Sequence, residues 1–374
     1  MAEAPSVKTG GIEDSAPRRP FSNTKAMKRL AAFRYALDEH NEIASGPHAR
    51  VFRWRDPEIG DDCALKAIPR AAFGNTLAAF LHEAEHVFAE PHPNVVAPRY
   101  VCTEGSAILI ATPFYARGSL ASRISAGPLA LGRTLRLTRD VLAGLSHIHK
   151  RGFLHLDLVP TNVLVSDLDV AMLADFGQAR ESADGTVRFS PACTMNVPPE
   201  VLKGRKASEA SDVYQAGLVL YRAVNGEPFY LSQVPRDERL LRSRIASGKF
   251  PNRADFMPHV PNAVRAIIQK ALSTDARSRY QCAADLAGSL AEVSVLNDWE
   301  TSIAPSGATT WQASRSRDTR LEVVMEPHGK GWSAGLQTLE LGDARAEGRR
   351  AFWRTGLSRS EAVFHLKRIF ENLE

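Results

Sequence analysis

The chain has no long hydrophobic segment and few cysteines. No run of about 18 apolar residues occurs, so the sequence predicts no membrane-spanning helix and no membrane partner. The first twenty residues contain no apolar stretch typical of a secretory signal. The 4 cysteines form no C-x-x-C pair and no Cys/His group with zinc spacing. We therefore expect a cytoplasmic protein that folds without disulfides or structural zinc.

The chain also lacks a concentrated block of charge. Its 47 Lys and Arg residues against 42 Asp and Glu residues give a net charge of +5, but the positive charge is spread along the sequence. No aromatic-basic block stands out along the chain, so the sequence disfavours nucleic acid as a partner. The 44% of hydrophobic residues is enough for an ordinary buried core.

Composition divides the 374 residues into one large domain with flanking segments. Residues 1–22 are rich in Pro, Gly, Ser and charge, which indicates a disordered tail. Residues 23–40 are compatible with a lead-in helix. Residues 41–115 are rich in strand-like patterns, whereas residues 116–295 have the periodicity of helices.

In the first part of the domain we predict strands at Arg50–Arg55, Cys63–Ile68 and Ala107–Thr112, where short apolar or alternating runs are bounded by turn residues. Between them, Thr76–Ala89 has the composition of a helix and ends just before two prolines.

In the second part we predict helices at Thr134–Lys150, Glu209–Asn225, Pro261–Leu272 and Ala283–Val295. The first has an apolar stripe at helical spacing and is followed by Gly152, a natural helix stop.

The last eighty residues indicate an appendage. Residues 296–317 are rich in Ser and Thr and predict a linker. Residues 318–374 predict a small ββα module with strands at Leu321–Met325 and Ser333–Leu341. Its helix starts at a capping box, which begins at Ser358. Such a module could bind a regulator, dock a substrate or brace the main domain.

Polar residues with the chemistry of metal-assisted proton transfer lie in and after one loop. Asp157 and Asn162 are five residues apart, so both can face one cavity, where the carboxylate can accept a proton and the amide oxygen can bind Mg²⁺. Asp175 supplies a charged metal ligand, and Gly177 lets the backbone turn away. Lys66 projects from a predicted strand.

The order and spacing of these residues resemble the signature motifs of the protein kinase family. The resemblance covers residues 41–295, and the matching positions are Lys66, Glu83, His155, Asp157, Asn162, Asp175-Phe176-Gly177, Pro198-Pro199-Glu200, Asp212, Gly217 and Arg279.

The resemblance implies an α+β, bilobal kinase fold with a sheet-rich N-lobe (41–115) and a helical C-lobe (116–295). It also implies ATP and Mg²⁺ (or Mn²⁺) as cofactors and a protein substrate phosphorylated on Ser or Thr. The implied catalytic residues are Asp157, Lys66 and Glu83, and the implied metal ligands are Asn162 and Asp175. Arg279 is expected to pair with Glu200.

The resemblance also implies where ATP binds. The expected ATP-binding residues are Ala44, Gly46, Val51, Ala64, Lys66, Thr112, Tyr115 and Leu164. Thr112 is expected beside the adenine together with Pro113, which has no N–H to donate.

Three positions depart from the family pattern. The glycine-rich loop keeps only Gly46, which places the backbone farther from the phosphates. Leu156 replaces an arginine that reads a phosphate on the activation segment, so we expect activity that needs no phosphorylation there. Val159 replaces a lysine that contacts the γ-phosphate, which predicts a slower enzyme.

Two alternative functions remain open on the sequence. Leu156, Val159 and the poor glycine loop also suit a pseudokinase scaffold that binds nucleotide weakly. A small-molecule phosphotransferase would share the H-x-D motif and a later metal-binding aspartate. Pro198-Pro199-Glu200, Asp212 and Arg279 argue against that second alternative.

Overall fold

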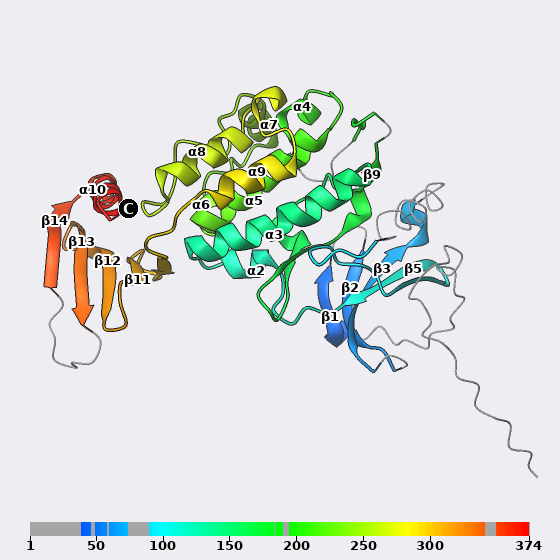
Figure 1. Ribbon diagram of the computed structural model, residues 1–374, viewed down its shortest axis with the longest axis horizontal. Helices are drawn as coiled ribbons and strands as arrows, with labels where there is room; N and C mark the ends of the chain where they lie inside the picture. Colours follow the sequence, from blue (N-terminus) through cyan, green and yellow to red (C-terminus); the bar gives the residue numbers. More distant parts are fainter. Residues whose placement is uncertain are drawn as a thin grey trace, which may run out of the picture.

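The computed structural model describes residues 39–45, 49–57, 60–73, 90–182, 184–189, 194–340 and 349–373. The expected tail (1–22), nearly all of the expected lead-in helix (23–40) and the expected helix at Thr76–Ala89 lie outside the described residues. Along its longest axis the molecule shows an N-terminal sheet, a helical lobe and a C-terminal sheet with one helix (Figure 1). The expected bilobal α+β fold is confirmed.

The small lobe is a five-stranded antiparallel sheet with the order β1-β2-β3-β5-β4. Its strands are β1 (Glu42–Ser45), β2 (Arg50–Arg55), β3 (Asp62–Pro69), β4 (Tyr100–Glu104) and β5 (Ala107–Pro113). The three predicted strands are therefore confirmed as β2, β3 and β5, and β1 and β4 complete the sheet. One face is covered by an apolar cluster that contains Leu65, Cys102, Leu109 and Ala111.

The large lobe consists of helices packed around α5. Its helices are α2 (Leu120–Ile124), α3 (Leu131–Lys150), α4 (Pro199–Leu202), α5 (Glu209–Asn225), α6 (Glu227–Leu231), α7 (Glu238–Ala246), α8 (Asn262–Ala271) and α9 (Ala283–Ala291). Every residue from Ala210 to Asn225 is buried. A helix that is buried all round occupies the centre of a lobe, which explains the run of apolar residues in α5.

Helix α3 shows how close packing depends on single residues. Its stripe of Leu137, Val141, Leu145 and Ile148 is buried, as the sequence predicts. A side chain at Gly144 would place its Cβ 2.4 Å from the carbonyl oxygen of Asn94, so only glycine permits this approach. After α3, Gly152 adopts φ +83 and ends the helix.

Two short antiparallel strand pairs lie in the large lobe, between α3 and α4 in the sequence. The first joins β6 (Phe153–Leu154) to β9 (Arg180–Glu181), and the second joins β7 (Val163–Val165) to β8 (Ala171–Leu173). The loop between β6 and β7 contains Asp157, and the turn after β8 contains Asp175. Asp175 pairs with Lys66 of the small-lobe sheet, which places this turn at the boundary between the lobes.

The C-terminal module differs from its prediction. It is a five-stranded antiparallel sheet in sequence order, followed by α10 (Arg359–Glu371). Its strands are β10 (Glu300–Ile303), β11 (Thr309–Ser314), β12 (Thr319–His328), β13 (Gly331–Glu340) and β14 (Arg349–Leu357). The expected linker at 296–317 is thus wrong, because it contains β10 and β11. Threonine is β-branched and suits strands, and in β11 the alternating Trp311 and Ala313 face the core.

The expected capping box of the last helix is confirmed. The Ser358 hydroxyl accepts a hydrogen bond from the Glu361 N–H at 3.3 Å, and Glu361 Oε2 accepts one from the Ser358 N–H at 2.8 Å. The helix packs Ala362, Leu366 and Ile369 into the apolar core of the module.

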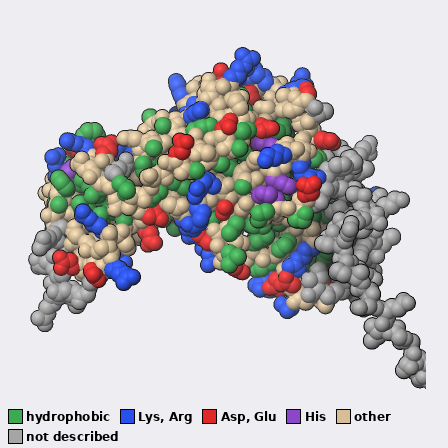
Figure 2. Space-filling model, in the orientation of Figure 1, with side chains coloured by type: hydrophobic (Ala, Val, Ile, Leu, Met, Phe, Trp, Pro, Cys, Tyr) green, Lys and Arg blue, Asp and Glu red, His purple; other side chains and the backbone are tan. Residues whose placement is uncertain are grey.

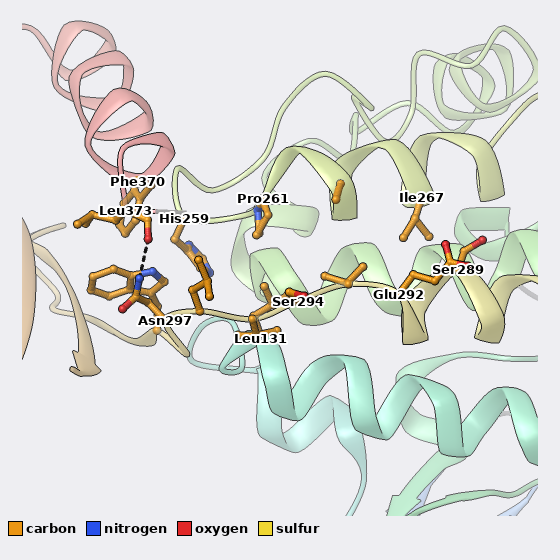
Figure 3. Close-up of a pocket in the computed structure, with 15 residues that line it drawn as sticks. Leu131, His259, Pro261, Ile267, Ser289, Glu292, Ser294, Asn297, Phe370 and Leu373 are labelled. Carbon is orange, nitrogen blue, oxygen red and sulfur yellow. Dashed lines mark hydrogen bonds between the residues drawn. The ribbon is translucent and has the colours of Figure 1, made fainter. Parts of the chain in front are cut away.

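The module packs against the large lobe at the end remote from the small-lobe sheet (Figure 1). At this seam Trp311 Nε1 donates a hydrogen bond to His259 Nδ1 at 3.0 Å. The ring of Phe370 lies edge-on to Trp299 and Trp311, with centroids 5.1 and 5.5 Å away. A largely apolar cavity of about 590 Å³ opens beside these rings, between α8, α9 and α10 (Figure 3).

The surface carries mixed charge. On the face shown in Figure 2, Lys and Arg side chains are interspersed with Asp and Glu over the large lobe and the module. In the part of the chain that the structure describes, no helix combines the length and apolar character needed to cross a membrane.

Candidate active site

A buried aspartate fixes the start of the loop His155–Asn162, which we call the catalytic loop. Asp212, near the N-terminus of α5, accepts hydrogen bonds from the backbone N–H groups of His155 and Leu156, both at 2.8 Å. Leu156 adopts φ +64, a conformation that L-residues rarely adopt. The two bonds to Asp212 stabilise this conformation and so set the backbone that leads into Asp157.

Asp212 is in turn paired with a histidine of α3. His149 Nε2 donates to Asp212 Oδ2 at 2.8 Å, and His149 Nδ1 lies 3.3 Å from Glu209 Oε2. Burial opposes charging of this imidazole, but the two carboxylates outweigh burial and raise the pKa of His149 to about 9. Burial likewise opposes ionisation of Asp212, yet its hydrogen bond to His149 leaves the pKa of Asp212 below its usual value. A charged pair therefore lies beneath the catalytic loop.

The catalytic loop brings Asp157 and Asn162 together. Asn162 Nδ2 donates to Asp157 Oδ2 at 3.0 Å and to the Asp157 carbonyl at 2.9 Å. Because the amide nitrogen of Asn162 is turned toward Asp157, the amide oxygen is the atom that can bind a metal ion. Burial, together with the nearby charge of Asp175, raises the pKa of the Asp157 carboxyl, which suits a proton acceptor.

An ion pair connects the two lobes beside this loop. Lys66 Nζ of β3 lies 2.6 Å from Asp175 Oδ1, which also accepts the Gly177 N–H at 3.3 Å. Asp175 itself adopts φ +62. Burial would raise the pKa of Asp175, but the Lys66 ammonium outweighs burial and lowers it. Asp175 is therefore a charged carboxylate at neutral pH.

His155 and Phe176 connect the catalytic loop to the turn after β8. Their rings meet edge to face with centroids 5.0 Å apart. His155 is fully buried, and its Nε2 lies 3.2 Å from the Ala174 carbonyl oxygen. The turn that carries Asp175 is thus packed directly against the loop that carries Asp157.

Five residues expected to bind ATP share one face of the small-lobe sheet. Across the strands Ala44 is opposite Val51, Val51 is opposite Lys66, and Ala64 is opposite Thr112. Residues directly opposite one another, or two apart on a strand, point to the same face. Lys66 projects from this face toward Asp175, whereas the other face carries the apolar cluster of the small lobe.

The other expected ATP-binding residues lie in several places. Leu164 lies in β7 and forms an isolated bridge with Ser119. Tyr115 follows β5, and burial raises the pKa of its hydroxyl. Gly46 and Glu83 lie outside the described residues.

The expected pair of Arg279 with Glu200 is confirmed. The guanidinium donates to both carboxylate oxygens, at 2.9 and 2.6 Å, and both side chains are buried. The Ser211 hydroxyl donates to the same carboxylate at 2.7 Å. This pair anchors α4 to the large lobe at the end of residues 175–200, which correspond to the activation segment of the family.

Two polar residues that support the catalytic loop belong to no motif recognised in the sequence. His149 follows the apolar stripe of α3 and precedes His155 by six residues, and Gln215 interrupts the apolar run of α5. In each case the available signal is a polar side chain on a helix face that faces the core. Such a residue requires a buried partner, but the sequence does not say which one.

The comparisons with known proteins agree with this geometry. Residues 37–288 match the protein kinase domain family. The serine/threonine-protein kinase PknK of Mycobacterium tuberculosis (strain ATCC 25618 / H37Rv) is 32% identical over 292 residues, which cover 75% of this chain and 25% of that protein.

Two further relatives are more distant. The probable serine/threonine-protein kinase PknB of Lactococcus lactis is 27% identical over 67% of this chain and 40% of its own length. The serine/threonine-protein kinase PrkC of Bacillus subtilis is 26% identical over 65% of this chain and 38% of its own length. The chain thus spans between a quarter and two fifths of the length of these curated relatives.

Proposed function

This chain belongs to the protein kinase family, and we propose that it transfers the γ-phosphoryl group of ATP to Ser or Thr hydroxyls of a protein. One observation carries the proposal: Lys66, Asp157, Asn162 and Asp175 converge between the lobes, although they come from segments up to 109 residues apart. A surface lysine or a turn aspartate would not require this convergence.

Each of these residues has a role that its surroundings support. Asp157, whose pKa is raised, accepts the proton of the attacking hydroxyl. Lys66 holds the phosphates of ATP, and Glu83, as the sequence predicts, orients Lys66. The shared face of Ala44, Val51, Ala64 and Thr112, with Gly46, Tyr115 and Leu164, forms the nucleotide site.

The donor set fits Mg²⁺ or Mn²⁺. Among the described residues no three His, Cys, Asp or Glu side chains gather as a metal cluster. Mg²⁺ in phosphoryl-transfer sites needs fewer protein ligands, because water and phosphate oxygens complete its coordination. The Asp175 carboxylate and the Asn162 amide oxygen would hold it, and the ion would neutralise charge on the phosphates.

Val159 makes the proposed enzyme slower than relatives with a lysine at this position. A charge-assisted contact to phosphate contributes about 1.5–3 kcal/mol. Its loss corresponds to a rate lower by roughly ten- to a hundredfold. The proton acceptor, both metal ligands and Lys66 remain, so we propose an active enzyme.

The setting of the reaction is also a proposal. We place the kinase domain at residues 41–295 and the reaction in the cytoplasm, where ATP is abundant. The described cysteines Cys63, Cys102 and Cys282 form no disulfide, as expected in a reducing compartment. Within the C-terminal module, residues 318–374 are proposed to dock a regulator or the substrate.

The direct test is phosphate transfer with γ-labelled ATP. The full chain is incubated with labelled ATP, Mg²⁺ and a bacterial lysate, and the labelled residue is mapped. We expect labelled Ser or Thr with the wild type and none above background with Asp157→Ala or Asp175→Ala. Calorimetric binding of magnesium nucleotide without any transfer would instead assign the chain as a pseudokinase.

A further inference from the structure

Gln215 lies at the junction of the catalytic loop and the activation segment. Its side chain is buried in α5, with 3% of the residue exposed. Gln215 Oε1 accepts the Leu158 N–H at 3.1 Å, and Gln215 Nε2 donates to the Leu156 carbonyl at 3.0 Å. Leu156 and Leu158 are the two neighbours of Asp157, so one amide holds the backbone on both sides of the proposed proton acceptor.

The same amide reaches the activation segment. Gln215 Nε2 uses its second hydrogen to donate to the Asn196 carbonyl at 3.2 Å. Asn196 ends the short 3₁₀ turn η5 (Thr194–Asn196), just before α4. Two carbonyl acceptors and one N–H donor permit only one orientation of the amide, which satisfies both hydrogens and the oxygen.

Leu156 cannot make a charged contact between the catalytic loop and the activation segment. Leu156 packs into an apolar cluster with Leu154, Val197, Val201 and Ala207. A leucine in that cluster cannot bind a phosphate. The described contacts of the catalytic loop with residues 196 and 197 therefore pass through a neutral amide and apolar side chains.

The rest of η5 is held by neighbouring helices. The Tyr230 hydroxyl of α6 donates to the Met195 carbonyl at 3.1 Å. Arg222 of α5 donates to Asn196 Oδ1 at 3.3 Å, and the Thr194 hydroxyl donates to Glu238 of α7 at 2.9 Å. Each of these contacts is made by an ordinary hydroxyl or guanidinium donor and requires no phosphate group.

We propose that Gln215 is a positioning residue that fixes the backbone on both sides of Asp157 and couples it to η5. This inference rests on the proposed function, because the position of Asp157 matters only if Asp157 accepts a proton. Leu156 cannot couple the catalytic loop to the activation segment, because it cannot bind a phosphate there. The uncharged Gln215 side chain provides this coupling instead.

The physical consequence is a specific loss of turnover when the amide is removed. Gln215→Met keeps the length of the side chain but leaves two carbonyls and one N–H without their partner. A displacement of about 1 Å at a reacting group costs roughly a hundredfold in rate. We expect kcat to fall by about ten- to a hundredfold. KM for ATP should stay unchanged, because Gln215 contacts neither Lys66 nor Asp175.

A matched control lies on the same helix. Asn225 is 1% exposed, its Nδ2 donates to the Tyr221 carbonyl at 2.8 Å, and its Oδ1 accepts the Met257 N–H at 2.7 Å. Asn225→Leu therefore also removes a bonded buried amide, but at a place remote from Asp157. It should lower stability to urea in the same way as Gln215→Met and leave kcat unchanged.

Two readouts on the full chain test the inference. The first is the rate of phosphate transfer to myelin basic protein and to the chain itself at varied ATP concentration. The second is hydrogen exchange of peptides that cover residues 154–162 and 194–198. We expect Gln215→Met to lose kcat and to lose protection at both peptides, and Asn225→Leu to keep both.

The outcomes separate the inference from the function on which it rests. If the wild type transfers no phosphate to any acceptor, the proposed function fails, while hydrogen exchange still decides whether Gln215 holds the loop. If the wild type is active and the two variants show equal kcat and equal protection at residues 154–162, the positioning role of Gln215 is overturned.

Discussion

The site between the lobes around Lys66, Asp157 and Asp175, which we call the cleft, differs from the seam between the large lobe and the C-terminal module in what holds it together. The cleft contains the partly exposed ion pair of Lys66 with Asp175, and the buried pair of His149 with Asp212 lies beneath its catalytic loop. The seam contains the rings of Trp299, Trp311 and Phe370, and burial lowers the pKa of His259 to about 3, so that this histidine is neutral there.

The difference follows from what each region does. Burial of a charge costs free energy unless a partner compensates it, so a contact that only holds two parts together is more cheaply made of apolar groups. Under the proposed function the cleft retains charges because phosphates, a metal ion and a proton are bound there. We therefore expect substitutions in the cleft to affect the rate and substitutions at the seam to affect stability alone.

The largest effect is expected from the proton acceptor. Asp157→Asn keeps the shape of the side chain but removes its basicity, so the rate should fall by roughly 10²–10⁴-fold. The rate is measured with γ-labelled ATP, and folding is checked by thermal unfolding. Asp184→Asn, which alters an exposed aspartate paired with Lys206, serves as the control. An Asp157→Asn enzyme with most of the wild-type rate would contradict the assignment.

The second effect concerns the buried pair that anchors the activation segment. Arg279→Met leaves the Glu200 carboxylate buried without its partner, which should destabilise the fold by about 3–5 kcal/mol in urea unfolding. The exposed pair of Arg242 and Glu238 is the comparison, because Arg242→Met should cost less than about 1 kcal/mol. Equal losses for the two variants would show that burial of the Glu200 pair does not matter.

The third effect is a dependence of stability on pH. The pKa of His149 is raised from 6.5 to about 9 in the fold, so its contribution is fully present below pH 6.5. That contribution, at most on the order of 3 kcal/mol, is lost as pH rises through 9. Urea unfolding between pH 6 and 10 measures it. His149→Gln should flatten the decline, and an unchanged slope in this variant would assign the decline to other groups.

The fourth effect tests the seam. Trp311→Phe keeps an aromatic ring but removes the hydrogen bond to His259, which should cost about 1–2 kcal/mol. The rate of phosphate transfer should not change, since the seam lies at the end of the large lobe remote from the small lobe. A fall in kcat with this variant would show that the module communicates with the cleft.

The smallest effect is expected in the activation segment. Alanine at all four hydroxyl residues from Ser182 to Thr194 should leave the rate nearly unchanged, because Leu156 cannot read a phosphate there. The variant is assayed beside wild type that has been treated with phosphatase. A fall beyond about tenfold, which corresponds to about 1.4 kcal/mol, would show that phosphorylation is required.

Much of the fold and of the candidate site follows from local sequence patterns. The apolar stripe of α3 and the alternation in β2 predict their elements because each pattern lies within a few residues. The Ser/Thr-rich segment before Thr319 has the composition of a linker but forms β10 and β11. Trp311 and Ala313 become core residues only when β12 and α10 cover them, and the composition of the segment does not predict these partners.

The sequence by itself predicted the chemistry, since the residue types and spacing of Lys66, Asp157, Asn162 and Asp175 resemble the protein kinase motifs. The tertiary structure alone decided how Asp157 is held. The partners of His149 and Gln215 are buried backbone and carboxylate groups that are distant in sequence. A buried polar side chain needs a hydrogen-bond partner, but only the packing of α3, α5 and the catalytic loop decides which partner it has.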